Sequence, residues 1–362
     1  MKTKIITLIC IAAIAVTFSR CSKASLTPTT ADGTLEGQIL ADFPTNLANP
    51  NYLDIETKAG IMNDAIATLI ATPTDGNLKA AQTAWKNTRA AWESCEGYLF
   101  GPVEDFNYDP TMDDWPVNKT DLDVLLASSN PLAVADIDTL GTTLKGFHAI
   151  EYVIFGVGST KKVAQITARE KVYLSSLAQS LYNTTKELRN SWDPSQSGNF
   201  SLQVTNAGKG STRFTTRLDF FKALVGSMAD ICNEVANEKM QTPYAAKDST
   251  LDESSFSHNS VTDFTNNIQG IGNAYLSTYN STGGHSLSEL VKSKKSSLDA
   301  TIQAQIKAAV SSFDVLSKNN ITYEKAIYSN RAQVVAIQNT INTLKATLDG
   351  DLTDFIQANI KD

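Results

Sequence analysis

The sequence is poor in the side chains and motifs that most enzyme sites and metal centres use. Its 362 residues include only three histidines and four cysteines. It contains no His-Glu-x-x-His, no Cys-x-x-Cys, no Gly-x-Ser-x-Gly and no nucleotide-binding glycine-rich loop. These absences exclude the commonest classes of zinc peptidase, thiol oxidoreductase, α/β-hydrolase and nucleotide-binding protein.

Long hydrophobic runs are also missing beyond residue 16, where no segment approaches the roughly 20 apolar residues that a membrane helix needs. Hydrophobic residues make up 42% of the chain and charged residues 19%, as is typical of a globular protein. The 38 acidic residues outnumber the 31 basic ones, and the formal net charge is −7. This surplus argues against nucleic acid as a partner and suits a cationic ligand.

Residues 1–20 have the order of parts found in a secretory signal peptide. Two lysines precede the apolar stretch Ile5–Val16, and Cys21 follows shortly after it. This order is typical of a bacterial lipoprotein signal, in which Cys21 becomes the lipidated first residue and residues 21–33 form a polar tether. An ordinary signal peptide with a chance cysteine is the alternative. We therefore expect an exported protein, anchored by lipid at Cys21 to the periplasmic or surface face of the outer membrane.

Apolar residues recur at helical spacing along the rest of the chain, and long alternating runs rich in Val, Ile and Tyr are lacking. The sequence therefore predicts an all-α fold. The predicted helices cover residues 50–72, 77–98, 119–128, 141–155, 164–190, 212–242, 262–280, 286–317 with a break near 295, and 322–348, with a short helix at the C-terminus.

The longest stretch without helical periodicity is 193–211, and we place a linker between two domains there. Residues 34–192 would form an N-terminal helical bundle, and residues 212–362 a C-terminal bundle packed against it. Cys95 and Cys232 fall in predicted helices, and we expect two buried free thiols there in preference to a disulfide.

The first informative motif is Gly-Phe-His-Ala-Ile-Glu, with the imidazole at His148 and the carboxylate at Glu151. Side chains three residues apart share one face of a helix, so these two can bind one metal or each other. The residues around them are apolar, which predicts a buried helix. A buried carboxylate is costly unless it is paired or metal-bound. A metal-binding pair and a hydrogen-bonded core pair both satisfy this pattern.

The second motif aligns aromatic and charged side chains. Residues Trp85, Arg89, Trp92 and Glu96 follow one another by four, three and four positions, which places them on one stripe of a helix. Tryptophans at this spacing usually pack in a core. An arginine and a glutamate on the same inward stripe need partners, and a binding site is one way to supply them.

The third motif is the polar run 252–271, which contains His258 and several carboxylates and leads into a predicted helix. It fits a site loop, and it also fits a solvated loop in which Ser260 or Thr262 caps the helix. His285 follows two glycines in a predicted loop, and we assign it no role.

Together these segments resemble the imelysin family of bacterial cell-envelope proteins. Its Gly-x-His-x-x-Glu signature is matched by Gly146, His148 and Glu151. The tryptophan-rich segment, the Trp115-Pro116 pair and the polar run follow in the family's order, from about residue 35 to the end. The resemblance implies two helical-bundle domains with the signature helix near the groove between them. It also implies a link to iron acquisition, although the founding member was described as a peptidase.

If the family's functional residues are carried over by position, the resemblance implies that His148 and Glu151 bind a metal or form the functional site. Glu96 is then a further candidate ligand. The residues expected to line the same groove are Trp85, Arg89, Trp92, Glu253, Ser257, His258 and Asn259.

Three functions are compatible with these residues. The leading interpretation is a lipoprotein that binds iron or an iron-bearing ligand in the groove, because carboxylates with one imidazole suit iron. It would serve an iron-transport component and need no organic cofactor. The second is a metallopeptidase with zinc, which fits poorly because Tyr152 follows Glu151 and His258 would have to complete the site. The third is a metal-free lipoprotein that receives a partner protein, with His148 and Glu151 as a hydrogen-bonded pair.

Overall fold

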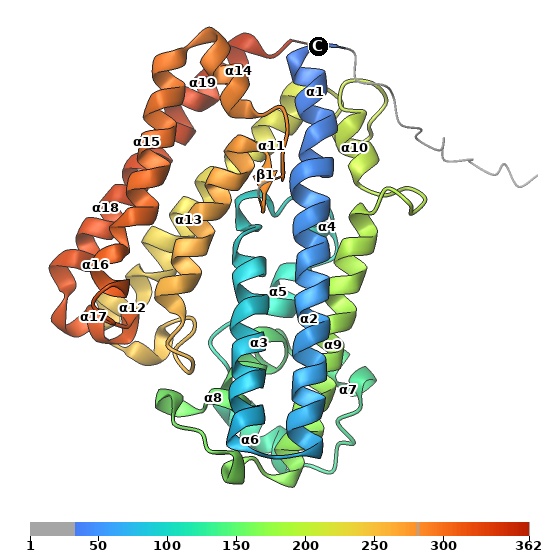
Figure 1. The fold of residues 1–362 in the computed structure, drawn as a ribbon, viewed down its shortest axis with the longest axis vertical. Coiled ribbons are helices and arrows are strands. Elements are labelled where there is room, and N and C mark those ends of the chain that lie inside the picture. The colour runs from blue at the N-terminus through green and yellow to red at the C-terminus, as the bar shows by residue number, and fades with distance from the viewer. Residues whose placement is uncertain (1–32, 281, 362) are drawn as a thin grey trace, which may run out of the picture.

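The structure is a computed structural model and describes residues 33–280 and 282–361. The predicted signal peptide and Cys21 lie outside these residues. In the described part, two helical bundles pack side by side and the regular structure is helical except for one two-stranded hairpin (Figure 1), which confirms the predicted all-α fold. None of the helices described is both long enough and apolar enough to cross a membrane.

The first bundle is built on three long helices, α2 (Asn49–Ala71), α3 (Asp75–Glu93) and α9 (Ala168–Trp192). Thr74 caps the start of α3, and Thr167 forms a capping box with Glu170 at the start of α9. The other elements of this half are α1 (Leu35–Asp42), the π-helical η1 (Phe43–Ala48), η2 (Glu96–Tyr98), α4 (Pro102–Asp105), α5 (Tyr108–Asp113), α6 (Lys119–Ala127), α7 (Val134–Asp138), η3 (Thr142–Leu144), α8 (Gly146–Phe155), η4 (Val157–Ser159), η5 (Val163–Gln165) and α10 (Ser201–Thr205).

The second bundle contains the long helices α11 (Arg217–Asn233), α13 (Ser260–Leu276), α15 (Ser296–Ser312) and α18 (Arg331–Thr347). The remaining helical elements are the π-helical η6 (Glu234–Lys239), α12 (Gln241–Ala246), η7 (Ser249–Leu251), α14 (Leu287–Lys294), α16 (Asp314–Ser317), α17 (Tyr323–Ser329), the π-helical η8 (Leu348–Leu352) and α19 (Thr353–Asn359). Strands β1 (Thr278–Tyr279) and β2 (Thr282–Gly283) form the antiparallel hairpin, with Thr278 opposite Gly283.

The predicted helices agree with these elements in position and differ mainly at their ends. The helix expected over 77–98 ends at Glu93, because the chain turns into η2. The helix expected over 322–348 is interrupted at Asn330. Helix α13 has Asn259 at its N-cap, so the predicted capping by Ser260 or Thr262 was wrong. The Ser260 hydroxyl donates to a carboxylate instead.

Cys95 and Cys232 are both buried and unpaired, which confirms the expectation of two free thiols. Burial raises the pKa of each thiol above its ordinary value. The predicted linker 193–211 contains helix α10, and the division into domains at this stretch stays a prediction.

The two bundles approach closely where η2 crosses α13. A Cβ atom on Gly97 would lie 2.8 Å from the carbonyl oxygen of Gly270, so neither position has room for a larger residue. Beside this crossing, Phe43 packs its ring against Tyr98, Phe100 and other aromatic residues of both halves. The close approach brings the end of α3 against α13, where polar side chains from both bundles meet in the interior.

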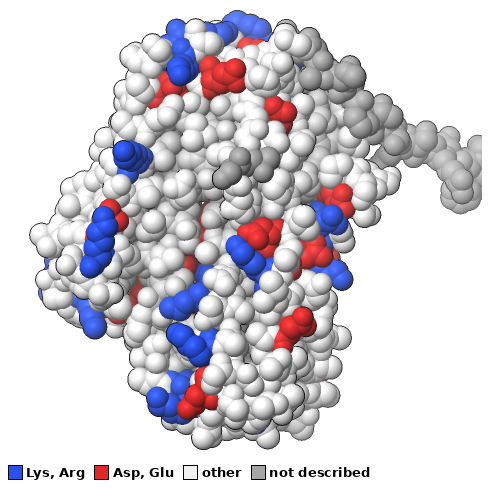
Figure 2. Space-filling model, viewed as in Figure 1, with Lys and Arg blue, Asp and Glu red and all other residues white. Residues whose placement is uncertain are grey.

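The outer surface gives little indication of this interior charge. On the face drawn in Figure 2, acidic and basic side chains are interspersed and neither sign forms a continuous patch. Many exposed charges pair within one turn of a helix, as Lys318 does with Asp314 and Lys345 with Asp349. Such pairs contribute little to stability.

Candidate metal centre

The start of α8 is held against α5 by a glycine. Gly146 has a φ of +75°, and a Cβ atom there would overlap the carbonyl group of Met112. Only glycine combines this backbone conformation with so close an approach. Two residues along α8, His148 therefore lies beside Asp113, the residue that follows Met112. Its Nε2 atom is 3.1 Å from Oδ1 of Asp113.

Glu151 fixes the orientation of the His148 ring. Its Oε2 atom is 2.9 Å from Nδ1 of His148, and its Oε1 atom accepts a hydrogen bond of 2.7 Å from the Ser257 backbone N–H. Because a carboxylate only accepts, Nδ1 is the donor in the contact with Glu151. The Nε2 atom is buried and has no hydrogen-bond partner. The unpartnered Nε2 atom thus lies beside a carboxylate oxygen that Arg89 also contacts, and a cation bound here would give Nε2 a partner.

Glu253 completes a group of three. Asp113, His148 and Glu253 are all buried, and each offers one ligand atom within 4.8 Å of the other two. The Glu253 Oε2 atom has no hydrogen-bond partner. Trp92 donates from its indole nitrogen to Oδ2 of Asp113 at 2.7 Å and so holds that carboxylate in place. Two carboxylates and one imidazole form a donor set that suits iron, manganese or zinc.

A second group consists of carboxylates alone. Glu93, Glu96 and Asp113 offer ligand atoms within 4.8 Å of one another, so Asp113 belongs to both groups. Asn267 on α13 donates to both glutamates, at 2.9 Å to Oε2 of Glu96. Glu96, a predicted ligand, thus belongs to the group of carboxylates and not to the group that contains His148.

Two permanent cations lie among these carboxylates. Arg89 pairs with Asp113, with Glu253 at 2.7 Å and with Glu93 at 2.5 Å. Lys239 pairs with Glu253 at 2.9 Å and with Glu96 at 3.2 Å. The two cations form one charged network with the buried carboxylates that contact them, which are Glu93, Glu96, Asp113, Glu253 and Asp263. The surplus of negative charge must be offset by protons or by a bound cation, because buried unpaired charge is costly.

Among these groups, the pKa of one carboxylate is lowered and the pKa values of several others are raised. Burial would raise the pKa of Glu253, but the charges of Lys239 and Arg89 outweigh it and lower this pKa to about 2. Burial raises the pKa of Asp263 to about 7 against the opposing effect of Arg89, and it also raises those of Glu93 and Glu96. Glu253 is therefore ionised and ready to bind a cation at any physiological pH.

A cavity of about 520 Å³ adjoins the first group. His148 and Glu253 line its inner part, and the side chains that line the remainder include Val117, Lys119, Asp252, Phe256, His258 and Glu324. His258 binds Glu324 through Nδ1 at 2.6 Å, and its side chain is one-third exposed, at 34%. Of the three residues of the first group, His148 and Glu253 are the two that line this cavity.

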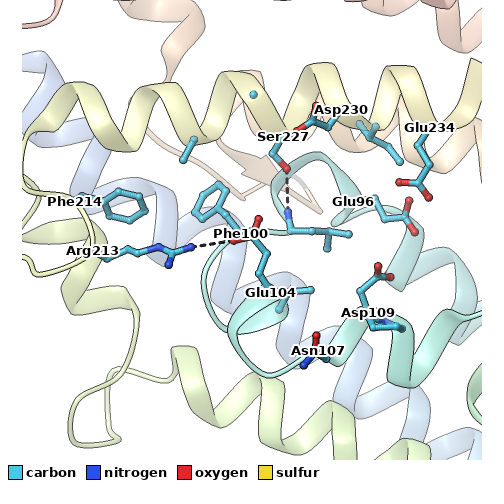
Figure 3. Close-up of a pocket in the computed structure, with 16 residues that line it drawn as sticks. Glu96, Phe100, Glu104, Asn107, Asp109, Arg213, Phe214, Ser227, Asp230 and Glu234 are labelled. Atoms are coloured by element: carbon cyan, nitrogen blue, oxygen red, sulfur yellow. Dashed lines mark hydrogen bonds and ion pairs between the residues drawn. The ribbon is translucent and has the colours of Figure 1, made fainter. Parts of the chain in front are cut away.

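A different cavity, of about 440 Å³, reaches the network at Glu96. Figure 3 shows the carboxylates of Glu96, Asp109 and Glu234 gathered at one end of it, with Arg213 and Glu104 paired at the other. Burial raises the pKa of Asp109 to about 6. The network is therefore approached from two cavities, and Lys239 lies between them because it contacts both Glu253 and Glu96.

The predicted site residues all lie in or next to this network, at different depths. Glu253 and His258 line the larger cavity. Trp85, Arg89, Trp92, Ser257 and Asn259 are buried behind it. Trp85 donates from its indole nitrogen to the Phe147 carbonyl at 2.9 Å, and Asn259 donates to Asp263 at 2.7 Å.

Four charged residues of the network were not predicted: Glu93, Asp113, Lys239 and Asp263. Glu93 lies four residues after Arg89 on α3, so its helical spacing could have identified it. Asp113 ends a six-residue helix with no useful periodicity, and its nearest signal is the Trp115-Pro116 pair that follows it. Lys239 lies at the end of a π-helical segment, where α-helical spacing is lost.

Comparison with known proteins gives concordant results. Residues 48–349 match the family model for imelysin. Over 265 residues the chain is 27% identical to iron-regulated protein A of Synechococcus elongatus, covering 73% of this chain and 69% of that protein. A crystal structure described as an iron-regulated protein A precursor from Parabacteroides distasonis superposes with a TM-score of 0.74 at 23% identity, covering 89% of this chain and 96% of the other. An imelysin-like protein from Psychrobacter arcticum gives 0.71 at 12% identity, with 90% and 96% covered. At these identities the two structures show a shared fold.

Proposed function

This chain belongs to the imelysin family, and on that premise we propose that it binds iron in the cell envelope at the centre formed by Asp113, His148 and Glu253. The relatives named above as iron-regulated support the choice of metal. The proposal includes a lipid anchor at Cys21 and delivery of the iron to a transport component. It treats iron as cargo, so the centre has to bind the metal and release it.

The observation that carries this proposal is that two buried atoms of the centre, Nε2 of His148 and Oε2 of Glu253, have no hydrogen-bond partner. The Nε2 atom of His148 lies 3.1 Å from Oδ1 of Asp113 without a hydrogen bond between them, and Arg89 contacts the same carboxylate oxygen. The unpartnered Oε2 atom of Glu253 belongs to the same group. Buried ligand atoms that converge and lack hydrogen-bond partners favour a metal cation.

Neighbouring residues hold the three ligands in position. Glu151 sets the tautomer and orientation of His148, and Trp92 fixes Asp113. Such supporting contacts commonly govern metal affinity. Arg89 and Lys239 contact Oε1 of Glu253, which leaves Oε2 for the metal.

Peptide hydrolysis has weaker support. The general base of a metallopeptidase must be free to accept a proton from water, whereas both oxygens of Glu151 already accept hydrogen bonds. The group formed by Asp113, His148 and Glu253 also contains only one histidine. His258, which the peptidase interpretation needed, lines the same cavity and binds Glu324.

The proposal is tested by metal analysis of the mature chain, from residue 22 onward, prepared without a histidine tag. We expect about one iron per chain after addition of ferrous or ferric iron, and loss of that iron in the double variant Asp113→Asn, His148→Ala. The matched control is His285→Ala, because His285 also pairs with a glutamate but lies outside the network. Iron retained by the double variant, or absent from the unmodified protein, would contradict the proposal.

A further inference from the structure

Lys239 is a buried cation at the edge of the proposed iron centre. Its side chain is 1% exposed, and its Nζ atom contacts Oε1 of Glu253 at 2.9 Å. The same nitrogen contacts Glu96 and Glu234, each at 3.2 Å, and lies 5.3 Å from the centre of the Trp115 ring. Three carboxylates and an aromatic ring therefore hold this ammonium group in place.

The backbone presents Lys239 from an unusual segment. Lys239 is the last residue of the π-helical η6, which continues α11, and it directly follows the exposed residues Asn237 and Glu238. A π-helical turn is rare and is frequently found at functional sites. Its extra residue changes which of the following side chains face inward. Here the segment ends by placing a cation against a carboxylate of the proposed centre.

Lys239 and Arg89 together occupy one oxygen of Glu253. Arg89 donates to Oε1 at 2.7 Å, and Lys239 contacts the same atom. A carboxylate oxygen has two lone pairs, so these two cations leave Oε1 with none for a metal. The other oxygen, Oε2, has no hydrogen-bond partner. Glu253 is therefore available to a metal through Oε2 alone, as a monodentate ligand.

This limit on Glu253 affects the choice of metal. Ca²⁺ takes about six to eight oxygen ligands, and a carboxylate that binds it through both oxygens supplies two of them. Iron binds imidazole well, whereas calcium prefers oxygen. At the proposed centre His148 offers a nitrogen, and Trp92 donates to Oδ2 of Asp113 at 2.7 Å. Few carboxylate oxygens are thus left for calcium.

We propose that Lys239 determines the metal specificity of the iron centre by keeping Glu253 monodentate, so that the centre rejects calcium. The inference rests on the proposed function, because it concerns the same three ligands. Calcium sites outside cells commonly have dissociation constants of about 10⁻⁴–10⁻³ M, so an iron centre in the cell envelope has to discriminate against this ion. Lys239 acts through Glu253 and is a positioning residue.

The test compares two dissociation constants. The mature chain from residue 22 onward, freed of metal, is titrated calorimetrically with Fe²⁺ under anaerobic conditions and separately with Ca²⁺. In the unmodified protein the dissociation constant for Ca²⁺ should exceed that for Fe²⁺ by at least about 100-fold, because the centre offers a nitrogen and few oxygens. The ratio of the two constants is the quantity that Lys239 should control.

Lys239→Met frees a lone pair of Oε1, so that Glu253 can bind Ca²⁺ through both oxygens. The variant should lower the calcium-to-iron ratio by about tenfold or more, since each added oxygen ligand favours calcium. The lost positive charge strengthens the binding of both ions to a similar degree, because both carry two charges. A change in the ratio therefore reports the number of ligand oxygens and not the change in charge.

The matched control is Lys86→Met. Lys86 donates to the Ser257 carbonyl at 3.1 Å, beside the backbone N–H that binds Glu151, and has no contact with Glu253. Its removal should leave the ratio unchanged. Lys239→Arg keeps a cation against Oε1 and should also keep the ratio of the unmodified protein. Thermal unfolding of each variant checks that the fold is kept.

The outcomes separate the two claims. A ratio that stays the same in Lys239→Met, or that falls equally in Lys86→Met, would overturn the role of Lys239 and leave the iron centre intact. Should Lys239→Met not fold, the unmodified protein decides, because Ca²⁺ bound within tenfold of Fe²⁺ would overturn the inference. Absence of Fe²⁺ binding in the unmodified protein would contradict the proposed function itself.

Discussion

The Nε2 atom of His148 lies 3.1 Å from Oδ1 of Asp113, and no hydrogen bond joins them. This contact arises because Gly146 lets the start of α8 press against the Met112 carbonyl, one residue before Asp113. The glycine, the histidine and the glutamate of the signature thus have three distinct tasks. In the proposed iron centre, Gly146 permits the approach, His148 would supply the ligand and Glu151 would orient it.

Glu151 is expected to act through His148. Glu151→Gln should lower the iron affinity by about 10- to 100-fold, because a contact that orients a metal-binding histidine typically has an effect of that size. A competition titration against a chelator of known affinity measures it. His148→Ala should abolish binding, so equal affinities for the two variants would mean that Glu151 is itself a ligand.

Gly146→Ala should destabilise the protein by at least about 2 kcal/mol, since it adds a strained backbone conformation to a steric overlap. Gly141→Ala is the matched control, because a Cβ atom there meets nothing within 4 Å and its φ is −57°. That variant should stay within about 0.5 kcal/mol of the unmodified protein. Chemical denaturation measures both, and a similar cost for the two would contradict this account of the signature glycine.

Arg89→Met should lower the free energy of unfolding by about 3–5 kcal/mol, because it leaves buried carboxylates without their cation. Lys318→Met removes an exposed partner whose side chain is 73% accessible and should change stability by less than about 1 kcal/mol.

Added iron should recover part of the loss in the Arg89 variant, since a ligand that binds the folded state stabilises it. Failure of iron to raise its melting temperature would contradict a cation site in this network.

The metal-free protein should become less stable as the pH rises toward 7. Asp263, with its pKa raised to about 7, binds a proton in the folded state that the unfolded chain has released above about pH 4. Asp109, with a pKa of about 6, adds to the same trend. The lowered pKa of Glu253 has the opposite effect on stability. The stabilisation that this carboxylate contributes is lost as the pH falls from about 4.5 to about 2.

Melting temperatures in chelator between pH 4.5 and 8 check this dependence. We expect a decline with rising pH in the metal-free protein and a flatter profile with iron bound, because the metal offsets the buried negative charge. A metal-free protein that gains stability from pH 5 to 7 would contradict the predicted protonation of these carboxylates.

Much of the fold could be predicted because it depends on local patterns. Helical periodicity identified the long helices, and side chains next to them fix some of their starts, as Thr74 and Ser286 do by accepting from the backbone N–H three residues further on. The interruption at Asn330 and the π-helical segments were not predicted, since neighbouring elements determine them. The hairpin of β1 and β2 was missed because it is only two residues long on each side.

The candidate centre could be predicted only in part, because some of its residues meet through local spacing and others only through tertiary contacts. His148 and Glu151 share one helix turn, so their spacing reveals the pair. Asp113 and Glu253 join them through tertiary contacts that bring α5 and the loop before α13 to α8. A single sequence does not show which of its 38 acidic residues will meet in the interior.

The most direct test of the iron centre is a crystal structure of the iron-loaded protein with anomalous diffraction recorded above and below the iron absorption edge. The account predicts an iron peak within bonding distance of His148 Nε2, Glu253 Oε2 and a carboxylate oxygen of Asp113. An iron-loaded crystal without a peak at this position, or with its iron bound only at other residues, would contradict it.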